Sequence, residues 1–244
     1  DNNVAMGSGA LQANTTGTQN VAVGSLALDA ATTADDNTAV GYNALSQNTT
    51  GNQNVAVGSR AGDAITTGSE NTAIGFASLT NATTASDNTG IGRAALNQNS
   101  SGASNTAVGH DALEANTTAS NNTAVGKDAL TNNTTGAQNS SLGSLSLDAN
   151  TTGSHNTAIG YSALSANTTA DFNTAVGRNA LDINTTGGSN VAVGGNSLDA
   201  NTTGSTNTAI GTSSLSSNTT ASGNTAIGAN TLNANTTGTF FFFF

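Results

Sequence analysis

The chain has 244 residues and a formal net charge of −10, yet only 7% of its residues are charged, against roughly 25% in ordinary globular domains. Its four Lys and Arg residues cannot neutralise a phosphate backbone, so we expect no nucleic-acid partner. The lack of Cys excludes disulfides and thiolate-bound metals, and no apolar stretch approaches the roughly 20 residues of a membrane-spanning helix.

Asn recurs every 17 residues from Asn3 to Asn224, which gives 14 repeat units with no insertion between them. Disordered chains tolerate changes of length, whereas a fixed period indicates that each residue stacks on its equivalent in the next unit. We therefore predict a single repeat array over residues 3–239, part of a longer fibre. Positions within a unit are numbered from this Asn, and the residues at one position of successive units form a column.

Each unit follows the pattern Asn-Thr/Val-Ala-Val/Ile-Gly-x-x-Ala-Leu-x-x-Asn-Thr-Thr-Gly/Ala-x-x. Gly, β-branched residues and Asn are poor helix formers, and a unit of this length fits two or three short strands joined by tight turns. Thr38-Ala39-Val40 alternates larger and small side chains with the period of a strand, and Gly41 ends that strand. We predict an all-β fold, a parallel β-solenoid of fourteen 17-residue coils. Neighbouring coils would lie about 4.8 Å apart, in a rod about 65 Å long.

Two Asn columns are expected to face the interior. Asn fills position one in every unit and can form a hydrogen-bonded ladder along the stack. Position twelve is Asn in eleven units, and Ala31, Ile65 and Ala82 take its place in the others. Ile65 lies in the one unit where Gly62 replaces the Leu of position nine, which we interpret as compensation of volume. Position twelve is therefore expected to point inward, near position nine.

The pattern leaves open which side of the strand faces inward. Position three is always small, and positions two and four lie on the opposite side of the strand. If position three lines the interior, Val108, Val125 and Ile159 at position four face outward and form an apolar stripe that other chains must cover. If Val/Ile and Leu fill the interior instead, a single-chain rod is expected. The thin core favours a trimer, with the single-chain rod as the alternative.

The segments Asn20-Val21-Ala22-Val23-Gly24 and Asn156-Thr157-Ala158-Ile159-Gly160 resemble the head repeats of trimeric autotransporter adhesins. The whole unit that starts at Asn156 is also similar to repeats of bacterial and phage tail-fibre-domain proteins. The resemblance covers nearly all of residues 3–239. It implies a left-handed parallel β-roll, a homotrimer and an extracellular location, on a cell surface or a virion fibre. The adhesin head repeats are generally shorter than this unit, and neither a coiled-coil stalk nor a membrane anchor is recognisable.

No arrangement of side chains points to catalysis. His110 and His155 occupy different columns, at positions six and seventeen. Asp35-Asp36 is interpreted as a solvated turn, and no Asp recurs in each unit as it does in calcium-binding repeats. The Asn48-Thr49-Thr50 triplet matches a glycosylation sequon, but an inward Asn is inaccessible, so we interpret such triplets as structural. We expect no enzyme activity, no cofactor and no metal site.

Position six is the candidate functional site. Its column also contains Ser, Gly, Thr and Ala, and a column that accepts every size of side chain is expected to be exposed. Exposed aromatic and Arg residues are favoured at interfaces, so the column is either a free surface or a stripe for recognition or lateral contact. The candidate contact column consists of Tyr42, Phe76, Arg93, His110, Lys127, Tyr161 and Arg178.

Together these observations predict a structural fibre or adhesin shaft. It would associate with itself and contact a host surface protein or glycan, with no membrane insertion. The alternatives are an ice-binding solenoid and a carbohydrate-binding rod that uses position-six aromatics such as Tyr161. Against ice binding, Thr15 and Thr16 are adjacent and would point to opposite faces of a strand. The Phe240–Phe244 run is set apart as an artefact or an apolar terminal plug.

Overall fold

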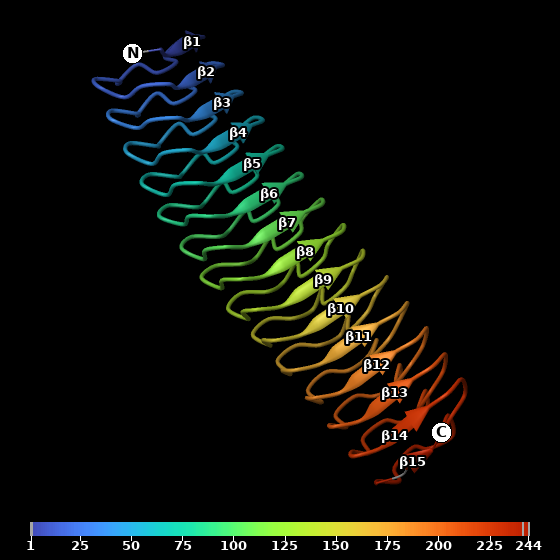
Figure 1. The fold of residues 1–244 in the computed structure, drawn as a ribbon. Helices are drawn as coiled ribbons and strands as arrows, with labels where there is room; N and C mark the ends of the chain where they lie inside the picture. Colours follow the sequence, from blue (N-terminus) through green and yellow to red (C-terminus); the bar gives the residue numbers. More distant parts are fainter. Residues whose placement is uncertain (1, 241, 244) are drawn as a thin grey trace. The chain divides into compact units, whose positions relative to one another are not determined.

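The structure is a computed structural model that describes residues 2–240 and 242–243, and within that range it contains strands and turns but no helix. It divides into two compact units, Asp1–Asn121 and Asn122–Phe244. Each unit is a parallel β-solenoid, in which every strand lies beside the strand of the next coil (Figure 1). The first unit contains β1 (Val4–Met6), β2 (Val21–Val23), β3 (Thr38–Val40), β4 (Val55–Val57), β5 (Thr72–Ile74), β6 (Thr89–Ile91) and β7 (Thr106–Val108). The second contains β8 (Thr123–Val125), β9 (Ser140–Leu142), β10 (Thr157–Ile159), β11 (Thr174–Val176), β12 (Val191–Val193), β13 (Thr208–Ile210), β14 (Thr225–Ile227) and β15 (Phe242–Phe243).

The strands pair in parallel, each residue opposite the residue one repeat later. In the first unit Ala39 of β3 lies opposite Ala56 of β4, and in the second Ala158 of β10 lies opposite Ala175 of β11. The parallel solenoid and the stacking of equivalent residues are therefore confirmed. Register is fixed because a slip of one residue would place inward side chains on the outer face.

Each repeat coil contains one strand, at positions two to four, rather than the two or three that the sequence suggested. The coil of residues 37–53 shows why: Gly41, Asn43, Leu45 and Gln53 have φ values of 140°, 54°, 50° and 58°. Each of these residues interrupts the extended backbone that a second strand would need. A non-Gly residue with such a φ costs about 1–2 kcal/mol, and it persists only where the surrounding packing enforces it. The buried Leu side chains provide that packing.

Small and apolar side chains fill the interior of each coil. Ala39, Ala44 and Leu45, at positions three, eight and nine of one coil, each have 0% of their surface exposed. The position-nine residues from Leu28 to Leu215 that are Leu are all fully buried. Position three therefore lines the interior, which settles the question that the sequence left open.

Both Asn columns are buried and hydrogen-bonded. The backbone N–H of Asn54 donates to Oδ1 of Asn37 at 2.9 Å, and Nδ2 of Asn54 donates to the same oxygen at 3.1 Å. Within one coil, Nδ2 of Asn37 and Nδ2 of Asn48 both donate to the carbonyl oxygen of Gly51, each at 2.9 Å. The predicted ladder at position one is thus confirmed, and the Gly51 carbonyl joins it to the position-twelve Asn. A buried polar group without a partner costs about 1–3 kcal/mol. A shifted stacking of the coils would break the ladders, so the ladders favour the observed one.

Position twelve points inward even where it is not Asn, since Ala31, Ile65 and Ala82 are fully buried. From the sequence, the Phe240–Phe244 run was set apart as an artefact or an apolar terminal plug. Residues 241 and 244 lie outside the described residues, and the backbone of β15 pairs in parallel with β14, Phe242 opposite Thr225.

Candidate functional site

All seven residues of the candidate contact column are exposed, as the sequence predicted. Each follows the Gly of position five, which ends a strand, so each is the first residue of a turn. The backbone at this point is held in place: the N–H of Arg60 donates to the carbonyl oxygen of Tyr42 at 2.8 Å, and the N–H of Ala94 donates to that of Phe76 at 3.0 Å. The column therefore presents variable side chains from a fixed backbone. Tyr42, Phe76, Arg93 and His110 belong to the first unit, and Lys127, Tyr161 and Arg178 to the second.

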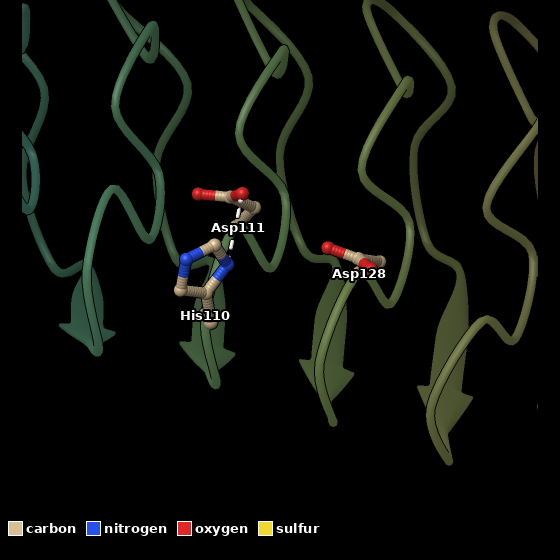
Figure 2. A group of neighbouring side chains, drawn as sticks. All are labelled: His110, Asp111 and Asp128. Atoms are coloured by element: carbon tan, nitrogen blue, oxygen red, sulfur yellow. Dashed lines mark ion pairs between the residues drawn. The ribbon is translucent and has the colours of Figure 1, made fainter.

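Arg93 and His110 form an ionic cluster with Asp111, the residue at position seven. Nδ1 of His110 lies 2.9 Å from Oδ2 of Asp111, and Figure 2 shows the ring beside that carboxylate. Nη1 of Arg93 lies 3.2 Å from Nε2 of His110 and 3.3 Å from Oδ1 of Asp111. Arg can only donate, so Nε2 accepts and the proton of a neutral His110 sits on Nδ1, where it is donated to Asp111. Because all three side chains reach solvent, the cluster orients them more than it stabilises the fold.

The acidic partners at position seven were missed when position six was considered alone. Lys127 pairs with Asp128 at position seven. Arg60, a cation at position seven, pairs with a carboxylate at position ten, and its Nε lies 3.5 Å from Oδ2 of Asp63. Adjacent charges of opposite sign in the sequence, as in Lys127-Asp128, were the available signal. The cations of both pairs are more than half exposed, whereas Asp63 is buried. Pairs that reach the surface through one partner in this way contribute about 0–1 kcal/mol.

The aromatic members of the column are the most exposed of its apolar groups. Tyr42 and Phe76 are each 53% exposed and Tyr161 is 51% exposed. In the first unit the position-six residue between Tyr42 and Phe76 is Ser59, which is only half-buried. Tyr161 has Ser144 before it and Arg178 after it in the column. At position six, the first unit therefore carries a pair of aromatic side chains and the second unit carries a single one.

A second surface is formed by positions two and four of the strands, which we call the outer strand face. Ile74 and Ile159 at position four are 36% and 39% exposed, and Leu142 is 50% exposed. Val108 and Val125, also at position four, are half-buried in the single chain. The outward orientation of Val/Ile, one of two alternatives from the sequence, is therefore the observed one in both units.

Positions sixteen and seventeen carry turn interactions that the sequence did not reveal. The rings of His155 and Phe172, at position seventeen of consecutive coils, are stacked at 4.8 Å with an interplanar angle of 2°. Position sixteen forms a third side-chain ladder, in which Oγ of Ser69 accepts the backbone N–H of Asn52 at 3.0 Å. Asp35 belongs to this ladder, because its Oδ1 accepts the backbone N–H of Thr18 at 2.6 Å. Of the pair interpreted from the sequence as a solvated turn, Asp36 is exposed, whereas Asp35 is half-buried and accepts a hydrogen bond within this ladder.

Three carboxylates at position ten stand in unfavourable surroundings. Burial raises the pKa of Asp29, Asp148 and Asp199 above the ordinary value of 3.8, although backbone hydrogen bonds partly lower it again. The negative charges of Asp128 and Asp182 raise the pKa of Asp148 further. Within the described residues, Oδ1 of each of the three has no hydrogen-bond partner. An unpaired buried carboxylate oxygen favours the protonated form.

The sequon Asn of Asn48-Thr49-Thr50 has 0% of its surface exposed and donates to Gly51. A fully buried, hydrogen-bonded amide is not available to a glycosyltransferase. The structural interpretation of this triplet is supported by the same contacts that build the position-twelve column.

Comparison of the chain with protein-family models, with curated proteins and with solved structures gives no match. Within the described residues no pocket is detected. The same part of the chain has no helix with the length and apolarity needed to span a membrane.

Proposed function

We propose that the chain is the shaft of an extracellular fibre, on a cell surface or a virion, that spaces or attaches without catalysis. In this proposal the coils form a left-handed β-roll and three copies associate through the outer strand face. The resemblance to adhesin head and tail-fibre repeats supports the handedness and the number of chains.

The observation that carries the proposal is the outward position-four column. Val57, Ile74 and Ile91, in consecutive coils of the first unit, are 38%, 36% and 36% exposed. In the second unit, position four of β8–β14 is likewise Val or Ile, with one Leu. Soluble monomers rarely leave a continuous apolar patch of this kind in water. Copies of the same chain would present the same stripe with the same spacing, so self-association covers it without a further partner.

The experiment is sedimentation equilibrium on the unaltered chain and on the Val108→Asp/Val125→Asp variant, with electron micrographs of both. The proposal expects an elongated trimer that dissociates or becomes locally disordered when the two carboxylates enter the outer strand face. Thr118→Asp, at an exposed turn position, is the matched control and should remain trimeric. A monodisperse monomer in the unaltered chain would overturn the trimer and leave the solenoid intact.

A second candidate is ice binding, which the outer strand face favours more than the sequence suggested. The adjacent Thr15 and Thr16 argued against it, but Thr72 and Ile74 of β5 lie on one face with one residue between them. Hydroxyl and methyl groups thus alternate across a regular parallel sheet. Thermal hysteresis that is lost in a Thr89→Lys variant of a monomeric protein would favour this candidate. A trimer without hysteresis would favour the fibre, because both functions need the same face.

A further inference from the structure

The first unit carries two aromatic side chains at one position of alternate coils. Tyr42 follows β3 and Phe76 follows β5, and both are 53% exposed. Between them, after β4, stands Ser59. Figure 1 shows the three strands lying side by side in that order.

The backbone fixes the separation of these residues. The N–H of Gly58 donates to the carbonyl oxygen of Val40, and the N–H of Gly75 to that of Val57, each at 2.8 Å. Neighbouring parallel strands lie about 4.8 Å apart, so Tyr42 and Phe76 originate about 9.6 Å apart. Both side chains start from hydrogen-bonded turns, so little backbone freedom is lost when a ligand binds.

The space between the two aromatic side chains is bordered by small and polar groups. The Ser59 side chain is too short to fill it. Arg60, the next residue, is 55% exposed and uses Nε for its ion pair with Asp63. Within the described residues its other guanidinium nitrogens form no hydrogen bond or ion pair, so they can donate to a ligand hydroxyl.

From this geometry we infer that Tyr42, Ser59, Arg60 and Phe76 form a binding site for an extended, neutral, β-1,4-linked glycan. Each face of a pyranose ring carries C–H groups that pack against the negative face of an aromatic ring. In an extended β-1,4-linked chain, sugars two residues apart present the same face and are separated by a length similar to the Tyr42–Phe76 spacing. Arg60 would then bond the hydroxyls of the intervening sugar. An anionic chain fits less well, because the protein has a net charge of −10.

This site is separate from the outer strand face on which the fibre proposal rests, so the two can fail independently. Isothermal titration with cellohexaose and chitohexaose, on the full chain, tests the site directly. We expect binding to at least one of them and none to maltohexaose, whose α-1,4 linkages curve the chain. Tyr42→Ala and Phe76→Ala should each weaken binding about tenfold or more, while Tyr161→Ala, at the single position-six aromatic of the second unit, should leave it unchanged.

The decisive variant keeps the number of aromatic residues and changes their spacing. Ser59→Tyr/Phe76→Ser places the two aromatics in adjacent coils, about 4.8 Å apart. Ser, Tyr and Phe all occur at position six, so the variant is expected to fold, and its thermal unfolding is measured beside the parent chain. We expect its affinity for the hexasaccharide to fall to that of Phe76→Ala. Unchanged affinity in this variant, equal binding of maltohexaose, or no binding to either β-1,4-linked hexasaccharide would overturn the inference.

Discussion

Cδ1 of Ile65 lies 3.1 Å from the point that a Cβ on Gly62 would occupy. Gly62 stands where other coils have Leu, with a φ of 60°, and Ile65 stands where most have Asn. The Ile side chain thus fills the interior that the missing Leu leaves empty. Gly also removes the cost of a left-handed φ that Leu bears in the other coils.

This compensation predicts strong coupling between the two positions. Gly62→Leu alone should destabilise the fold by about 1–3 kcal/mol, because its Cβ would lie 3.0 Å from Cδ2 of Leu45 and 3.1 Å from Cδ1 of Ile65. Ile65→Asn alone should cost about 2–4 kcal/mol through lost volume. The double variant restores the common Leu/Asn pair and should recover about 1–3 kcal/mol of the sum. Urea unfolding of all four proteins measures the coupling, and simple additivity would contradict the compensation.

The position-one ladder predicts a large loss for Asn54→Ala. The substitution removes the acceptor of the Asn71 N–H at 3.0 Å and the donor to the Gly68 carbonyl at 2.9 Å, both buried. The expected loss is about 2–5 kcal/mol in the free energy of unfolding, with faster amide exchange at Asn71. Asn52→Ala removes one exposed turn bond at 2.7 Å and should cost about 0.5 kcal/mol or less. Equal losses in the two variants would show that burial of the ladder is irrelevant.

The Gly column at position five predicts that Gly177→Ala is disruptive. Gly177 has a φ of 135°, and an added Cβ would lie 2.5 Å from the carbonyl oxygen of Gly194. The clash and the unfavourable φ together should cost about 2–6 kcal/mol in thermal or urea unfolding. Gly195→Ala is the control, because its Cβ would meet only the Arg178 carbonyl oxygen at 4.0 Å and Ala229 occupies the same position of another coil. A tolerated Gly177→Ala would mean that the coils can separate locally.

The raised pKa of Asp148 predicts a pH-dependent gain from Asp148→Asn. The folded pKa lies above the ordinary 3.8 because burial disfavours the charge. The folded state therefore gains stability as the pH falls from neutral through the raised pKa, and the gain levels off below 3.8. At neutral pH the variant should be more stable by about 0.5 kcal/mol or less, since the group is half exposed and solvent screens it. Asn97 and Asn233 show that an amide fits at position ten.

Urea unfolding between pH 3 and pH 7, on the order of one measurement per pH unit, checks this prediction. The difference between the variant and the parent chain should shrink as the pH falls and become constant below the ordinary Asp pKa. Asp36→Asn, at an exposed turn residue, serves as the control. A difference that does not change with pH would contradict the assigned effect of burial.

The sequence by itself determined the period, the parallel stacking, the inward Asn columns and the exposure of position six. Each of these features follows from comparing the repeat units along the sequence. When every unit has the same length, equivalent residues such as Asn37 and Asn54 must stack. A column that holds both Tyr42 and Ser59 accepts side chains of very different size, so it cannot be packed inside. The pairing of Gly62 with Ile65 was predictable for the same reason, since two exceptions in one unit point to one shared space.

The tertiary structure alone decided how each coil closes. A strand such as Thr38–Val40 presents Ala on one face and Thr and Val on the other, and either face is apolar enough to be interior. The positive φ values of Asn43 and Leu45 turn the chain so that the Leu side chain enters the interior of the coil from the side opposite the strand. It leaves room only for Ala at position three of the strand. Local pattern could not show this, because Leu rarely adopts a positive φ and does so here only where the packing of the stacked coils enforces it.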